Sequence, residues 1–189
     1  RTEDVSYMVY KASLSDMQEL RTAIASKSIP VPFSLRGNSF ARYLERNGCT
    51  ETVDYLIFAK ECEPYVTQRD AWDDTPRNVP DMERLIEKGL QRFLYIKSHY
   101  IRLRYAYQLI RLAHYAGKYE QVLELYAYLM PKIDNDPSLI EYWIEGHRAG
   151  ALRALGDNVE ASYRYALVFQ YCPSRRESAL QSFLIRSDR

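Results

Sequence analysis

The stretch from Arg102 to Pro131, "RLRYAYQLIRLAHYAGKYEQVLELYAYLMP", decides the fold class of this chain of 189 residues. Apolar residues recur at helical spacing before Gly117, and they do so again between Gly117 and Pro131. Glycine suits the left-handed conformation that follows a helix, and proline lacks the N–H that a continuing helix needs. The stretch therefore predicts two helices joined by a turn of about two residues, which must lie antiparallel as a hairpin.

The same succession of helix, glycine, short turn, helix and proline occurs three times along the chain. The three units run from Gly48 to Pro64, from Gly117 to Pro131 and from Gly156 to Pro173. Each predicted hairpin has apolar residues on more than one face, so it needs neighbours on both sides to bury them. We therefore expect a stack of antiparallel helix hairpins.

The second and third units resemble a tetratricopeptide repeat. The positions that carry the resemblance are Leu109, Gly117, Tyr119 and Tyr126 in one unit and Ala149, Gly156, Ala161, Tyr165 and Pro173 in the next. Gly117 and Gly156 lie 39 residues apart, against a family period of about 34, and the family's tryptophan position holds Ala106 or Glu145. The resemblance implies an all-α fold in which antiparallel helix hairpins stack as a short right-handed α-solenoid.

The chain is expected to divide into an N-terminal helical hairpin region at 1–80 and tetratricopeptide-like repeats with a C-terminal capping helix at 81–189. The N-terminal region ends in an irregular stretch at 65–80, and we expect both parts to form one continuous domain. Ser15 and Gln18 have the spacing of a capping box, which predicts that the first helix begins there.

Caps and prolines predict the other helix boundaries. A helix capped by Thr50 is expected to end at Pro64, which cannot donate a backbone hydrogen bond. A break is expected at Lys97 and Ser98, the polar interruption of a long helical stretch. One further helix is predicted to start with Asp136 as its N-cap and Pro137 at its first helical position. The last helix is predicted to start at a capping box formed by Ser174 and Glu177.

Small residues gather on the helix predicted at 138–155, namely Gly146, Ala149, Gly150 and Ala154. A glycine inside a helix costs about 1 kcal/mol relative to alanine. The close approach of a neighbouring helix is the expected compensation.

The composition indicates a folded helical protein without a strong electrostatic preference. Apolar residues make up 47% of the chain, and 17 tyrosines stand against 7 glycines and 8 prolines. Lysine and arginine number 26 against 25 acidic residues, so net charge gives no case for nucleic acid or an anionic membrane. No apolar run is long enough to span a bilayer. We expect a fragment of a longer protein whose targeting signals lie elsewhere, which leaves its compartment open.

Catalytic motifs are missing from the sequence. It has no glycine-rich phosphate loop, no His-Glu-x-x-His and no Gly-x-Ser-x-Gly. His147 lies one turn from Trp143, and a structural role is favoured there over that of a general base. We therefore expect no enzyme activity and no catalytic or cofactor-binding residue.

Metal-binding patterns are missing as well. The three cysteines form no Cys-x-x-Cys pair and are interpreted as buried, inert thiols. Asp70, Asp73 and Asp74 lack the ligand spacing of a calcium loop, so a solvated loop is favoured. No metal site is expected.

One polar stripe on the helix before Gly117 is the candidate binding surface. At roughly 100° per residue, Arg104, Arg111 and Tyr115 fall together, and Tyr107 and His114 border the same face. In tetratricopeptide repeats the first helix of each hairpin lines a concave groove for partner peptides. The resemblance assigns these five residues to that groove and adds Trp143 and Arg153 from the next unit.

The groove is expected to be basic and aromatic, which suits an acidic or extended peptide. Arg102 falls outside the stripe, and its stem is expected to pack against apolar residues. The alternative is that Arg104 and Arg111 bind nothing and pair with carboxylates on adjacent helices, for which the candidates are Glu120, Glu124, Glu141 and Glu145.

The sequence thus predicts a non-enzymatic helical-repeat module for protein interaction or assembly, with a protein or an acidic peptide as its partner. One alternative is a helical accessory domain of an enzyme whose catalytic part lies outside this fragment. The other is a module for single-stranded nucleic acid, against which the near-neutral charge argues. The partner's identity and the oligomeric state stay open.

Overall fold

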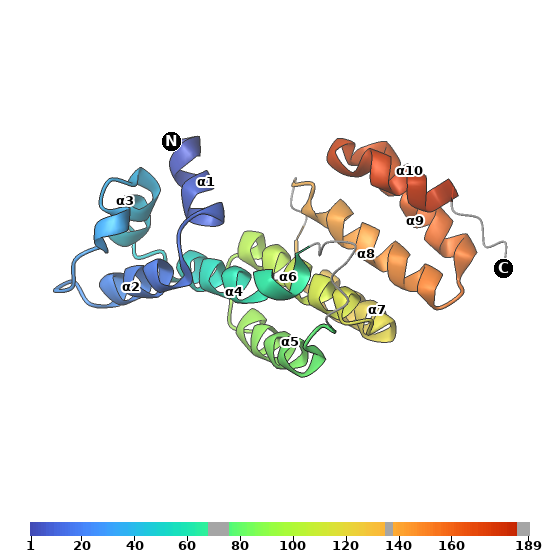
Figure 1. Ribbon diagram of the computed structural model, residues 1–189, viewed down its shortest axis with the longest axis horizontal. Helices are drawn as coiled ribbons and strands as arrows, with labels where there is room; N and C mark the ends of the chain where they lie inside the picture. Colours follow the sequence, from blue (N-terminus) through green and yellow to red (C-terminus); the bar gives the residue numbers. More distant parts are fainter. Residues whose placement is uncertain (68–75, 135–137, 185–189) are drawn as a thin grey trace. The chain divides into compact units, whose positions relative to one another are not determined.

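The computed structural model of the chain describes residues 1–67, 76–134 and 138–184. Within these ranges it contains ten α-helices and no strand, which confirms the all-α prediction (Figure 1). The expectations for Asp70, Asp73, Asp74, Asp136 and Pro137 lie outside the described residues. Among the described helices, none combines the length and the apolar composition that a bilayer crossing requires.

The chain forms two compact units, Arg1–Pro64 and Tyr65–Arg189. The first unit contains α1 (Thr2–Tyr10), α2 (Leu14–Ala25), α3 (Ser39–Arg46) and most of α4 (Thr50–Val66). Helix α3 packs against α1 and α2. The apolar core of this first unit includes Met8, Met17, Leu20, Leu44 and Val53, all of them buried.

The first helix begins earlier than the sequence indicated. Residues 2–10, which precede the first helix predicted from the sequence, form α1. The capping box of α2 involves Ser13 and Asp16 instead of Ser15 and Gln18: the Ser13 hydroxyl accepts from the Asp16 N–H, and the Asp16 carboxylate accepts from the Ser13 N–H. Ser15 lies inside the helix, where its hydroxyl bonds to Glu19.

Helix α4 continues past the proline that was expected to end it. Pro64 lies within α4, which ends at Val66. In the last turn of a helix, proline removes a single hydrogen bond, and a helix that ends two residues later tolerates this loss.

The second unit contains α5 (Val79–Phe93), α6 (His99–Tyr115), α7 (Tyr119–Leu129), α8 (Ile140–Ala154), α9 (Asn158–Tyr171) and α10 (Arg176–Leu184). The break between α5 and α6 confirms the prediction at Lys97 and Ser98, and the Ser98 hydroxyl accepts from the N–H of Ile101. Helix α10 starts at Arg176, because Pro173–Arg175 form a 3₁₀ turn that takes in Ser174. The predicted Ser174 capping box is therefore wrong.

Helix α6 is the centre of this unit. It packs against α5, α7 and α8, and α8 packs in turn against α7 and α9, while α10 covers α9. Ten residues of α6 are buried, including Tyr105 and Leu109, which are fully enclosed. The turns after α6 and α8 are closed by Gly117 and Gly156, whose φ angles are +71° and +90°, as predicted for residues that end a helix in the left-handed region.

Candidate functional site

A cavity of about 260 Å³ lies between α6, α8, α9 and the start of α10. Its lining comes from the C-terminal turn of α6, one face of α8, and residues of α9 and α10. The polar and aromatic residues that matter for its chemistry are His114, Tyr115, Trp143, His147, Arg175 and Ser178. Among the described residues that line it, none is an aspartate or a glutamate.

The glycines of α8 shape this cavity in two ways. A Cβ atom at Gly150 would lie 2.7 Å from Cε1 of His114, so the absence of a side chain there lets the imidazole pack directly on the helix. The close approach predicted for the small-residue surface is thus present at Gly150. A Cβ atom at Gly146 would meet nothing within 4 Å, and Gly146 lines the cavity instead.

Two histidines face each other across the contact between α6 and α8. The ring centroids of His114 and His147 are 4.8 Å apart. Burial lowers the pKa of His114, and a hydrogen bond with the backbone of His147 opposes that shift in part. Burial also holds the pKa of His147 well below its ordinary value, and the charges of His114, Arg111 and Arg175 lower it further. Both imidazoles are therefore neutral at pH 7.

Two polar atoms in the lining are buried without a hydrogen-bond partner among the described residues. They are Nδ1 of His114 and Nε1 of Trp143. A buried polar atom without a partner costs about 1–3 kcal/mol, so native structures rarely contain one without a reason. His114 and Trp143 thus each hold, in the wall of the cavity, a buried polar atom without a partner among the described residues.

Arginines surround the aromatic walls. The guanidinium carbon of Arg175 lies 5.5 Å from the centre of the Trp143 ring. Those of Arg77 and Arg111 lie 4.7 Å and 5.9 Å from the centre of the Tyr115 ring. Such cation–π contacts hold positive charge close to the cavity without neutralising it.

The structure brings together three of the seven predicted groove residues in the cavity lining, namely His114, Tyr115 and Trp143. Tyr107 is 7% exposed and does not line the cavity itself. Its ring centroid lies 5.5 Å from that of Trp143, so it packs against a residue that does line the cavity. Arg153 donates to the carbonyl of Ser182 at the other edge.

The two arginines of the predicted stripe have other contacts. Arg104 donates to the carbonyl of Tyr100 at 2.8 Å, and its guanidinium lies over the Tyr100 ring. Arg104 does not line the cavity, which α6 reaches only with His114 and Tyr115 in its last turn. Arg111 donates to the carbonyl of Val66 at 3.0 Å. Arg102 has the structural role expected of it, because it donates to the carbonyls of Ile96 and Lys132.

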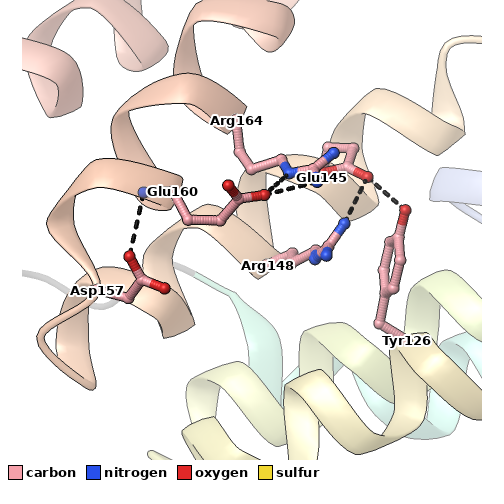
Figure 2. A network of polar contacts seen from close by, with 6 residues as sticks. All are labelled: Tyr126, Glu145, Arg148, Asp157, Glu160 and Arg164. Atoms are coloured by element: carbon pink, nitrogen blue, oxygen red, sulfur yellow. Dashed lines mark hydrogen bonds and ion pairs between the residues drawn. The ribbon is translucent and has the colours of Figure 1, made fainter.

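Glu145, which was considered as a partner for these arginines, belongs to a different network on the other side of α8 (Figure 2). It accepts from the hydroxyl of Tyr126 and pairs with Arg148 at 3.5 Å and Arg164 at 3.9 Å. Burial and the bond to Glu145 raise the pKa of Tyr126 to about 12, so this tyrosine stays protonated and keeps donating. The network joins α7, α8 and α9 and fixes α8 as the wall of the cavity.

Sequence reasoning missed Arg175, Ser178 and the role of His147. The spacing of Trp143, Gly146, His147 and Gly150 on one side of α8 was the available signal, because it combines aromatic side chains with space. Arg175 lies in a turn whose position relative to α8 cannot be derived from helical periodicity.

The described residues contain no group of three or more histidine, cysteine, aspartate or glutamate side chains placed to hold a metal ion. Cys62 and Cys172 are buried and Cys49 is half-buried, and none of the three forms a disulfide bond within the described residues. Comparison with protein-family models, with curated proteins and with solved structures found no match for this chain.

Proposed function

We propose that this chain is a non-enzymatic helical-repeat module that binds another protein through a short acidic peptide. The observation that carries the proposal is the cavity between α6, α8 and α10, where half-buried aromatic side chains, polar atoms without a described partner and arginine charge occur together. An acidic peptide meets such a surface with charge-assisted hydrogen bonds and with contacts to aromatic faces.

The arrangement of the second unit supports a tetratricopeptide-like repeat within this proposal. Helices α6 and α7 are joined at Gly117, and α8 and α9 are joined at Gly156, each glycine having a positive φ. Helix α8 packs against both helices of the preceding pair, as stacked hairpins do. We propose that these pairs form a short right-handed α-solenoid with the cavity on the side of the first helices.

A cavity-filling variant tests the proposed binding site. Gly146→Leu adds a side chain where the backbone meets nothing within 4 Å, and it replaces a helical glycine with a better helix former. Ala154→Leu is the matched control, because Ala154 is an exposed residue of the same helix.

The measurement is the binding of arrayed decapeptides in acidic, neutral and basic sets to the wild-type chain and to both variants. We expect acidic peptides to bind the wild type and Ala154→Leu, and Gly146→Leu to bind them at least tenfold more weakly. The proposal is wrong if no set binds, or if Gly146→Leu binds as the wild type does.

A further inference from the structure

We infer that the cavity is a carboxylate site that takes up a proton when it binds, with His114 donating to the ligand from Nδ1. The inference rests on the proposed function only for the source of the carboxylate, which we assign to an acidic side chain or the chain end of the bound peptide. The binding chemistry itself is argued from the cavity.

Among the described residues, the charged groups that act on the histidine pair all have the same sign. From α6 the pair is faced by Arg111 and Tyr115, and a tyrosine of α7, Tyr119, has its ring centroid 5.8 Å from that of His114. Arg175 lies on the α10 side, and neither α8 nor α9 contributes a carboxylate to the lining. A bound carboxylate would therefore supply a negative charge that the described residues around the pair lack.

Donors for a carboxylate are available on three sides. Nε1 of Trp143 is buried without a partner among the described residues, and Ser178 and Arg175, which carry a hydroxyl and a guanidinium group, also line the cavity. Hydrogen bonds in which one partner is ionised are about twice as strong as those between neutral groups, so the anion gains more here than a neutral ligand does.

The fourth donor depends on protonation. Nδ1 of His114 has no hydrogen-bond partner within the described part of the chain, while the same imidazole makes a hydrogen bond with the backbone of His147. In the neutral ring one nitrogen carries the proton and the other is an acceptor, which repels a carboxylate oxygen. A proton on Nδ1 turns this nitrogen into a donor, and the negative charge of the ligand stabilises the imidazolium in return.

The size of the cavity limits the ligand. Its volume of about 260 Å³ corresponds to roughly eight or nine water molecules, each of which occupies about 30 Å³ in the liquid. This is smaller than typical sites for cofactors and drug-sized ligands, which occupy about 300–1,000 Å³. One acidic side chain fits, with its methylene groups against Tyr142, Trp143 and Tyr165. The aromatic rings of these three residues offer contacts to the methylene groups of a carboxylic acid, which inorganic phosphate lacks.

The experiment uses the full chain with Trp72→Phe, so that Trp143 is the single tryptophan and reports on the cavity. The probes are succinate, inorganic phosphate, a blocked hexapeptide with a central Asp-Glu pair and the same peptide with Asn-Gln. Trp143 fluorescence and the histidine ring NMR signals are followed at pH 5.5, 6.5 and 7.5. We expect the affinity for the acidic peptide to rise as the pH falls, by up to about tenfold per pH unit for each proton taken up.

Variants separate the cavity from general surface charge. Arg175→Ala is expected to lower the affinity for the acidic peptide about tenfold. Arg176→Ala is the matched control, because its guanidinium donates to the carbonyl of Phe169 at 3.0 Å and its side chain does not line this cavity. Circular dichroism checks that both variants fold.

The outcomes distinguish this inference from the proposed function. Acidic peptide that binds independently of pH and of Arg175 leaves the proposed function standing and overturns the carboxylate site. Succinate that binds with histidine protonation while the peptides do not bind supports the carboxylate site and contradicts the peptide-binding function. Equal affinity for phosphate, or no response of the folded chain to either carboxylate probe, overturns the inference.

Discussion

At the scale of single residues, two glycines on α8 are expected to respond oppositely to the same substitution. Gly150→Ala would place a methyl group 2.7 Å from the His114 ring, which is enclosed by neighbouring aromatic side chains. Overpacking of this kind typically costs about 1–3 kcal/mol, which exceeds the gain of about 1 kcal/mol from replacing a helical glycine. Gly146→Ala also replaces a helical glycine, but its methyl group would meet no atom within 4 Å, so only the stabilisation remains.

Chemical denaturation followed by Trp143 fluorescence in the Trp72→Phe background measures both variants. We expect Gly150→Ala to lower the free energy of unfolding by about 1 kcal/mol or more, and Gly146→Ala to raise it by up to about 1 kcal/mol. Equal effects of the two substitutions would mean that His114 does not pack against Gly150 in solution.

At the scale of one helix, the N-terminus of α2 distinguishes two serines that the sequence presents as equivalent. The Ser13 hydroxyl caps the helix by accepting from the Asp16 N–H at 3.0 Å, whereas Ser15 bonds only to an exposed Glu19 side chain. Loss of an N-cap costs about 1 kcal/mol. Ser13→Ala is therefore expected to lower the melting temperature measured by circular dichroism, and Ser15→Ala to leave it nearly unchanged. If Ser15→Ala lowered the melting temperature more than Ser13→Ala did, the capping box would be formed by Ser15 and Gln18 after all.

The error at this helix shows which features of the fold the sequence determines. The helix ends at Gly117 and Gly156 and the break at Lys97 and Ser98 were predicted correctly, because such interruptions depend on a few adjacent residues. Ser13 and Ser15 both precede helix formers and both have a polar residue three positions later, so local pattern alone does not choose between them. Helix α1 was missed because its packing against α3 comes from contacts distant in the sequence.

The candidate site was predictable in part for the same reason. His114, Tyr115 and Trp143 share helical faces that periodicity defines, and the structure places all three in the cavity. Arg104 has the same periodicity but lies near the other end of α6, over Tyr100. Arg175 reaches the cavity only because α10 folds back on α9, which no local pattern of the sequence encodes.

The contact between α6 and α8 is expected to weaken in acid. His114 and His147 have lowered pKa values in the folded chain, so below about pH 6.5 the unfolded chain binds more protons than the folded chain. The free energy of unfolding therefore falls as the pH falls, by up to about 1.4 kcal/mol per pH unit for each histidine. Asp4 and Asp16 also have lowered pKa values, but they lose their contribution at lower pH, near and below the ordinary aspartate value of 3.8.

Denaturation at pH 7.5 and pH 5.5, followed by Trp143 fluorescence, measures this dependence. His147→Gln removes one of the two titrating groups and is expected to make the dependence shallower. His99→Gln is the control, because His99 is a partly exposed residue at the start of α6, paired with Asp134. A wild-type chain that is equally stable at both pH values would contradict the lowered pKa of the histidine pair.

At the scale of the whole chain, the charge distribution argues for a local anion site and against an extended binding groove for nucleic acid. The chain has 26 basic and 25 acidic residues, and Arg77, Arg111 and Arg175 lie over aromatic rings near one small cavity. Proteins that bind single strands without sequence preference need a positive groove that follows several phosphates. Neutralising one phosphate changes little, because the affinity scales with the number of phosphate contacts.

A fluorescent single-stranded 20-mer tests this distinction by its polarisation at 50 mM and 200 mM salt. We expect no binding tighter than about 10⁻⁴ M at either salt concentration, which is the weak end of non-specific binding. Any weak signal should be displaced by succinate, because one carboxylate occupies the cavity that a single phosphate would enter. Tight binding that falls steeply with salt and resists succinate would place the nucleic acid on another surface, and the arginines around the cavity would then no longer be evidence for an acidic peptide.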